Sequence, residues 1–269
     1  MNHLNRSNAP ISNDAWDLLD EEAKEQLTPA LAARKLVDFS GPHGWEHSAS
    51  NLGRVSRVAG SPVDGVDVRQ RRVLPLIELR DEFTISREEL RNADRGAEDA
   101  DLDPLDQAAQ RIARAENTSV LHGFAAAGIE GVTESSSHPP ITLSEDFDDY
   151  PGHAAKAVEM LLAAGVGGPY GLALGPRCYT GVIESTEHGG ILVFDHLRQI
   201  LGGPIVWAPG VDGAIVVSVR GGDFLFESGQ DLSVGYDSHD GDNVRLYLEE
   251  SFSFRVAGGE AAVALVHPG

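Results

Sequence analysis

The sequence predicts a mixed α+β fold that consists of a helical body, an extended arm and a separate α/β lobe. The first observation is a pair of long strand-like runs over 49–85, which have too little apolar content to form a core of their own. The second is a long amphipathic helix that begins near residue 103. The third is a strand, helix, loop, helix and strand in succession over 169–209, an order typical of a compact α/β unit.

Length and composition limit the class of protein. The 269 residues suffice for one large domain or two interleaved ones. No apolar run approaches the roughly eighteen residues of a membrane span, and the polar N-terminus lacks the apolar stretch of a secretion signal. The single cysteine, Cys178, excludes an intrachain disulfide and fits a reducing compartment. We therefore expect a cytoplasmic protein that does not bind a membrane.

The N-terminal region predicts an amphipathic helix over 13–27. Ser12 can cap this helix, and Pro29 ends or kinks it. A short turn over 30–39 follows. The apolar stripe of the helix lies opposite a face of acidic residues and consists of Trp16, Leu19, Ala23 and Leu27.

The hairpin of 49–85, whose turn is expected at 60–65, is unusual in its charge. The chain has 21 Lys and Arg against 42 Asp and Glu, a formal net charge of −21 that disfavours a nucleic-acid partner. Between residues 51 and 80, however, six arginines face only three acids. They are either incidental charges on a solvated hairpin or the contacts of an arm that docks on an acidic neighbour, for which the acidic cluster of 98–106 is a candidate. The arginines of the hairpin itself are Arg54, Arg57, Arg69, Arg71 and Arg72.

Helices follow the hairpin, and strands close the chain. Ser86 opens a capping box and a short helix that stops near Gly96. Asp103 is the expected cap of the long helix, with Pro104 at its first position. After a further helix over 153–165, the last third alternates strands with glycine-rich turns, among them a hairpin at 240–241. The expected core face of the long helix consists of Leu105, Ala108, Ile112 and Ala115.

One motif suggests catalysis. His43-Gly44-Trp45-Glu46-His47 fits the H-x-x-E-H pattern of inverted zinc peptidases, which needs both histidines on one helical face. Gly41, Pro42 and Gly44 make a turn much more favourable here than a helix. We therefore interpret the stretch as a turn.

Other candidate sites also lack the required spacing. The run 237–242 places acids and a histidine together, but its glycine is one place too early for a calcium loop. No nucleophile elbow or phosphate-binding loop occurs. Glu187 and His188 lie in a glycine-bounded loop that is either plain surface or the lining of an opening. We predict no catalytic residue, metal site or cofactor, and a docking arm without a catalytic site suggests assembly.

Several long motifs, in order, resemble those of encapsulins, the shell proteins of bacterial and archaeal nanocompartments. The similar segments span the whole chain and read RSNAPIS, ARKLVDFSGPHGWEHSA, LPLIELRDEFT, RGGDF and GQDLSVGYDSHDGDNVRLYLEESFSF. The resemblance, to family 1 encapsulins, implies the tailed-phage major capsid fold with a peripheral domain, an axial domain and an extended E-loop. The implied parts are 1–48 (N-terminal helix and arm), 49–75 (E-loop), 76–130 (peripheral domain with the spine helix), 131–215 (axial domain), 216–255 (peripheral strands) and 256–269 (a C-terminal strand returning to the axial domain).

The resemblance also implies a function. Encapsulins assemble into closed icosahedral shells in the cytoplasm, and the smallest such shell has sixty copies. They enclose dye-decolourising peroxidases or ferritin-like proteins, which connects them with oxidative stress and iron storage. Cargo is bound through a C-terminal targeting peptide. The implied peptide contacts are Leu27, Leu31, Arg34, Asp38, Asp231, Leu232 and Val234, and the implied lining of the five-fold pore is Glu184, Glu187, His188 and Gly189.

Two alternatives remain at this point. A phage or prophage capsid protein would share the fold and package DNA, although the acidic charge speaks against it. Members of the family have also been described as bacteriocins and peptidases, so an enzyme or toxin is the second alternative.

Overall fold

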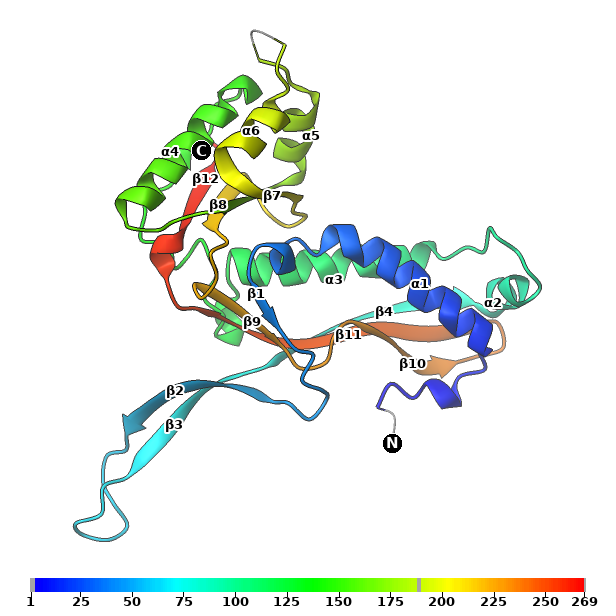
Figure 1. The fold of residues 1–269 in the computed structure, drawn as a ribbon. Helices are drawn as coiled ribbons and strands as arrows, with labels where there is room; N and C mark the ends of the chain where they lie inside the picture. The colour runs from blue at the N-terminus through cyan, green and yellow to red at the C-terminus, as the bar shows by residue number, and fades with distance from the viewer. Residues whose placement is uncertain (1–2, 188–189, 269) are drawn as a thin grey trace.

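The computed structural model describes residues 3–187 and 190–268, and it places a sheet-and-helix body between a protruding arm and a compact lobe (Figure 1). The centre of the body is β11 (Asn243–Val256). It pairs antiparallel with β4 (Ile77–Ser86), β10 (Ser233–His239) and β9 (Phe224–Ser228), and β9 pairs parallel with β1 (Asp38–Ser40). The hairpin expected at 240–241 is confirmed, because β10 and β11 are antiparallel neighbours joined there.

Two long helices cover this sheet: α1 (Asn13–Ala30) and α3 (Asp103–Leu121). The side chain of Ser12 accepts a hydrogen bond from the Ala15 amide at 3.0 Å, which confirms the expected cap of α1. The predicted stripe of α1 is buried against α3 and the sheet. The helix ends one residue after Pro29, and the short turn η2 (Ala33–Lys35) follows.

The core face of α3 differs from its prediction in one position. Leu105, Ala108 and Ile112 are buried, but Ala115 is exposed and the next two residues, Glu116 and Asn117, are buried. A step of four rather than three residues keeps a side chain on the same stripe at this point of the helix. The predicted cap is also shifted, because Leu102 is the N-cap and Asp103 is the first helical residue. Ser86 does cap the short helix α2 (Arg87–Asp94).

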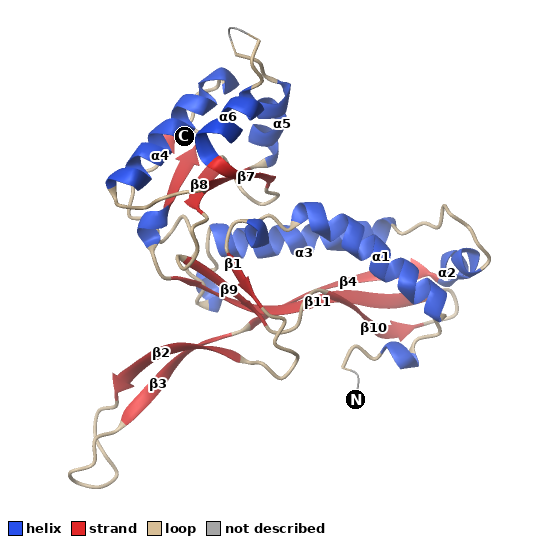
Figure 2. Cartoon of the chain, in the orientation of Figure 1, coloured by secondary structure: helices blue, strands red, loops and turns tan. Residues whose placement is uncertain are grey.

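The lobe is a second five-stranded sheet covered by helices (Figure 2). Its strand order is β5-β12-β8-β6-β7, and the predicted succession of strand, helix, loop, helix and strand is confirmed. The domain boundary expected at 215/216 falls inside β8, so the lobe extends to residue 218. The elements are β5 (Ile141–Thr142), α4 (Tyr150–Ala163), β6 (Tyr170–Leu174), α5 (Pro176–Glu184), α6 (Val193–Leu201), β7 (Gly202–Trp207), β8 (Ala214–Ser218) and β12 (Ala262–Val266).

The arm consists of β2 (Ala49–Arg57) and β3 (Arg69–Pro75), which pair only with each other within the described part of the chain. It extends well beyond the body (Figure 1), and most of its residues are exposed. The loop of 58–68 contains the turn expected at 60–65. The hairpin itself is shorter than the expected 49–85, because its second strand ends at Pro75 and the following residues form β4, which pairs with β11 in the body. Among the described residues, no helix has the length and apolarity that crossing a bilayer requires.

Candidate functional site

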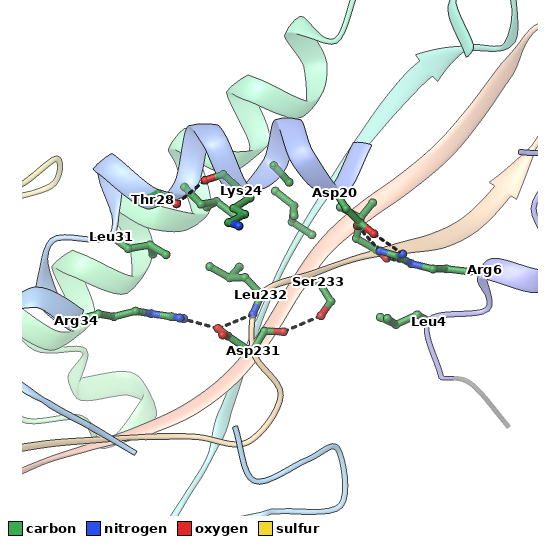
Figure 3. A pocket seen from close by; sticks show the side chains of 14 residues that line it. Leu4, Arg6, Asp20, Lys24, Thr28, Leu31, Arg34, Asp231, Leu232 and Ser233 are labelled. Atoms are coloured by element: carbon green, nitrogen blue, oxygen red, sulfur yellow. Dashed lines mark hydrogen bonds and ion pairs between the residues drawn. The ribbon is translucent and has the colours of Figure 1, made fainter. Parts of the chain in front are cut away.

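A groove of about 490 Å³ lies between α1 and the start of β10 (Figure 3). Its lining includes the buried apolar residues Leu27 and Val234. The charged residues Lys24 and Asp231, which also line it, are partly or largely exposed to solvent. Such a surface suits a peptide that buries aliphatic side chains and is oriented by a few charges. The lining consists of Leu4, Arg6, Asp20, Ala23, Lys24, Leu27, Thr28, Leu31, Arg34, Asp231, Leu232, Ser233, Val234 and Leu248.

Asn117 fixes the turn that carries Arg34. Its Oδ1 accepts from the amides of Ala32 and Ala33, both at 3.0 Å. Its Nδ2 donates to the carbonyls of Ala30 at 2.8 Å and Pro209 at 3.0 Å. The buried amide therefore uses both of its polar ends, and it ties the end of α1 to α3 and to the lobe.

Arg34 then donates to three different carboxylates. Its Nε is 2.7 Å from Oε2 of Glu116 on α3, its Nη1 is 2.6 Å from Oδ1 of Asp231, and its Nη2 is 2.7 Å from Oε2 of Glu250 on β11. The side chains of Glu116 and Glu250 are 0% and 1% exposed, whereas that of Asp231 is 44% exposed. The two glutamates of the cluster are therefore shielded from solvent inside the body, whereas Asp231 is in contact with solvent in the groove.

The surroundings shift the proton affinities of this cluster. Burial raises the pKa of Glu250 well above its usual value, and the charge of Glu116 raises it further against the opposing effect of Arg34. Burial also raises the pKa of Glu116, although Arg34 opposes that shift. Burial by itself would lower the pKa of Arg34, but the three carboxylates raise it above its usual value.

The N-terminal tail closes one end of the groove. Arg6 forms a two-pronged ion pair with Asp20 of α1, at 2.7 and 2.5 Å, and its Nε donates to the Val234 carbonyl at 2.8 Å. The Leu4 carbonyl accepts from the Tyr236 amide at 2.9 Å. These tail residues and both buried glutamates could not be predicted from the sequence, since no motif or periodicity marks a residue that acts through a distant partner.

Six of the seven predicted peptide contacts lie together along the groove: Leu27, Leu31, Arg34, Asp231, Leu232 and Val234. Asp38 does not line it. Its carboxylate accepts from the Gly222 amide at 2.5 Å and borders two other cavities beside β1 and β9. Asp38 therefore holds the glycine turn before β9.

The loop between α5 and α6 lies at the tip of the lobe and contains Glu187 (Figure 1). Glu184 is exposed at the end of α5. Oε1 of Glu187 is 2.7 Å from Nδ1 of His196 on α6, so this carboxylate has a partner inside its own chain. His188 and Gly189 lie outside the described residues.

The arginines of the arm differ in their partners. Arg57 and Arg69 face each other across the strands, and Asp67 lies within 3.2 Å of the first and 2.8 Å of the second. Arg54 and Arg72 also face each other, and Arg71 is opposite a valine. These last three arginines are exposed and have no ion pair with the described residues.

The stretch His43–His47 is a turn, as predicted. Nε2 of His43 is 3.0 Å from Oγ of Ser40, and Nε2 of His47 is 2.5 Å from Oε1 of Glu227. The two imidazoles contact each other with ring centroids 4.9 Å apart. Each histidine therefore packs within a loop beside β9 rather than on a helix.

Comparisons with known proteins agree with this architecture. The family model described as "Encapsulating protein for peroxidase" matches residues 1–253. A type 1 encapsulin shell protein of Rhodospirillum rubrum is 49% identical over 98% of this chain and 96% of its own length. A type 1 encapsulin shell protein of Mycobacterium tuberculosis is 41% identical over 99% of this chain and 100% of its own length.

Solved structures show the same fold at low sequence identity. The virus-like particle of Pyrococcus furiosus superposes with a TM-score of 0.62 at 18% identity, over 90% of this chain and 97% of that one. The Mycobacterium phage Bobi chain has a TM-score of 0.57 at 16% identity, over 88% of this chain and 90% of that one. The fold is thus that of phage capsid proteins, as the resemblance implied. The chain belongs to the encapsulin family, whose members are structural shell proteins that form capsid-like particles.

Proposed function

We propose that the particle formed by this chain encloses a cargo enzyme, and that the groove beside Arg34 binds the cargo's C-terminal targeting peptide. The single observation that carries this proposal is the groove itself, in which six of the expected contacts line one continuous surface. Apolar side chains on its floor supply affinity, and the charges at its rim set the direction of the peptide. The ion pairs of Arg34 and Arg6 hold both walls in place before the peptide arrives.

The cargo class that we propose is a dye-decolourising peroxidase. The description of the matching family supports it, because it names a peroxidase. A ferritin-like protein is the other cargo expected for such a shell, and the same experiment separates the two. We also propose that the loaded shell is cytoplasmic and contains sixty copies, the smallest icosahedral number.

The arm is proposed to be a contact between copies. Its ribbon has little core of its own, and three of its arginines form no ion pair with the described residues of a chain whose net charge is −21. An acidic surface of a neighbouring copy is the partner that its chemistry fits. On this proposal the arm corresponds to the E-loop, the body to the peripheral domain and the lobe to the axial domain, with the α5–α6 loop at the five-fold opening.

Co-expression tests the cargo proposal directly. The shell is produced with the peroxidase or with the ferritin-like protein of the same organism, each with and without its C-terminal tail, and particles are purified and imaged by negative stain. We expect the complete peroxidase to co-purify and the shortened one to be lost. Equal recovery of both forms would refute capture by the tail, and recovery of the ferritin-like protein alone would reassign the cargo.

A groove variant then locates the binding surface. Leu232→Asp places a charge on the apolar lining and should abolish cargo recovery without loss of particles, while Leu232→Met keeps an apolar side chain of similar volume and should load normally. Cargo is measured per assembled particle, so that an assembly defect is not mistaken for a binding defect. Normal loading of the aspartate variant would exclude this groove.

A further inference from the structure

The cluster around Arg34 has more carboxylates than its single cation can balance. If Glu116, Glu250 and Asp231 were all ionised, the four groups would carry a net charge of −2, and two of the anions would be fully buried. Asp231 is half exposed and is stabilised by water, but Glu116 and Glu250 are not. Two buried carboxylates beside one arginine are balanced when one of them holds a proton.

The hydrogen bonds of the two glutamates agree with a shared proton. Oε2 of each accepts from Arg34, which leaves both Oε1 atoms. Both Oε1 atoms are buried and receive no N–H or O–H donor from the described residues. Nε and Nη2 of the same guanidinium each bind one of these carboxylates, so the two carboxyl groups are neighbours. A proton on either glutamate can therefore be donated to the other.

The pair is mechanically connected to the groove. Glu116 comes from α3, Glu250 from β11, and Arg34 from the turn after α1, so the proton joins three segments distant in the sequence. Arg34 in turn holds Asp231 through an ion pair, and Oδ1 of Asp231 also accepts a hydrogen bond from the Leu232 amide at 2.9 Å. Arg34, Asp231 and Leu232 all line the groove.

The charged groups that face the pair are few. Arg34 from the turn and Asp231 from the loop before β10 are the ones that affect both glutamates. Glu249, the neighbour of Glu250 on β11, is 3.7 Å from Arg80 instead. The protonation of the pair is therefore governed within the cluster.

We propose that Glu116 and Glu250 are positioning residues of the peptide groove, which hold Arg34 and Asp231 in the peptide-binding geometry through one shared proton. This proposal rests on the proposed function of the groove. When the proton is lost, two adjacent buried anions repel each other and compete for Arg34. Asp231 then loses the ion pair that holds it at the wall of the groove. Peptide capture is then strong while the proton is present and weakens as pH rises through the titration of the pair.

The test measures how binding of a targeting tail inside assembled shells depends on pH. The probe is a fluorescent protein fused to the C-terminal tail of the peroxidase of the same organism, with a dye attached to the tail, loaded by co-expression. Anisotropy of the dye reports whether the tail is bound. In the wild type, binding should fall by about tenfold per pH unit above the titration of the pair, because one proton is lost. In Glu250→Gln, whose amide can donate to Glu116 and accept from Arg34, binding should not change over this range.

Glu116→Gln is the matched variant, because it also leaves one anion beside Arg34, and it should give the same flat profile. Infrared spectra provide a readout that does not depend on cargo. The carbonyl band of a protonated buried carboxylic acid should be present in wild-type shells at neutral pH and absent in Glu250→Gln. Identical pH profiles in wild type and both variants, or absence of the band in the wild type, overturns the proposal.

Failure of the proposed function gives a different pattern. A tail that is mobile at every pH, in shells whose infrared band is intact, shows that the groove does not bind the tail. That result refutes the proposal that Glu116 and Glu250 control binding of the tail. It leaves standing only the conclusion that the two glutamates share a proton.

Discussion

Arg34 is the residue on which most of the site's geometry depends, because its three carboxylate partners come from three different parts of the chain. Its side chain is only 14% exposed, and it also lies over the rings of Phe39 and Phe226 at 5.1 and 5.3 Å. A buried ion pair contributes little relative to an apolar replacement of all its members, but removal of one member alone is costly.

Replacement of Arg34 by methionine should therefore destabilise the subunit by about 3–5 kcal/mol, because the buried negative charge that Glu116 and Glu250 share loses its cation. Arg34→Lys keeps the charge but cannot reach three acceptors in a planar fork, so an intermediate loss is expected. Thermal unfolding of purified particles measures both. A methionine variant as stable as the wild type would show that the buried glutamates do not need the positive charge of Arg34 for the stability of the fold.

Asp106 gives a pH dependence of stability with the opposite sign to that of a usual acid. Burial, followed by the nearby Glu22, Asp103 and Asp101, raises its pKa to about 6. An unfolded aspartate releases its proton at a lower pH, so the folded state binds more protons in between. The stability due to this group is complete below the unfolded pKa and is lost as pH rises through about 6.

The neutral variant Asp106→Asn should remove this dependence. We expect a higher unfolding temperature than the wild type above pH 6 and little difference in acid, where the wild-type carboxyl is already protonated. Unfolding temperatures at several pH values provide the measurement, with Asp99→Asn as an exposed control. A uniform shift at all pH values would mean that the asparagine acts through packing alone.

At the scale of an element, the arm is a ribbon whose register places like charges together. Arg54 and Arg72 are directly opposite each other, an arrangement that disfavours an isolated hairpin. Asp67 relieves the corresponding repulsion between Arg57 and Arg69. The strands thus carry an unbalanced positive site on an exposed surface, which a carboxylate of another copy would neutralise.

The double substitution Arg54→Gln and Arg72→Gln should leave the subunit folded but reduce assembly, because the partner carboxylates lose their counter-charge. The control is Arg177→Gln, an exposed arginine that pairs with Glu145 of its own chain. Circular dichroism reports the fold, and size-exclusion chromatography reports the fraction of particles. Undiminished assembly of the double variant would remove the arginines from the contact.

The α5–α6 loop provides a second test at this scale. Glu187→Gln removes the anion that pairs with His196, and we expect slower passage of divalent cations if the loop lines an opening. Quenching of an encapsulated fluorescent protein by added cobalt(II) measures the rate. Glu159→Gln, an exposed change on α4, should leave it unaltered. An equal quenching rate in shells of the wild type and of both variants would mean that this loop does not line the opening.

At the scale of the whole molecule, the charge of −21 is repeated in every copy of the particle. Such a shell repels itself unless counterions and basic arms offset the charge. Salt screens both the repulsion between surfaces and the attraction of the arm, so the extent of assembly should depend on ionic strength.

Light scattering from about 0.01 M to about 1 M salt tests this dependence, since the Debye length falls from about 30 to about 3 Å over that range. We expect the scattering to change between the two limits, and the Arg54/Arg72 double variant should respond less than the wild type. Scattering that is the same at every ionic strength would count against an electrostatic role of the arm.

Local patterns in the sequence determined which helices and strands form, because caps, prolines and apolar periodicity act over a few residues. They predicted α1 with its Ser12 cap, the arm and the order of the lobe, and the family motifs predicted the capsid fold. They did not determine that the α3 stripe continues through Glu116 in place of Ala115, or that Asp38 lies apart from the groove. Those features depend on contacts between residues more than 80 positions apart, such as Arg34 with Glu116, Asp231 and Glu250. Only the tertiary structure decided them, because a charge is buried only where distant segments meet to pair it.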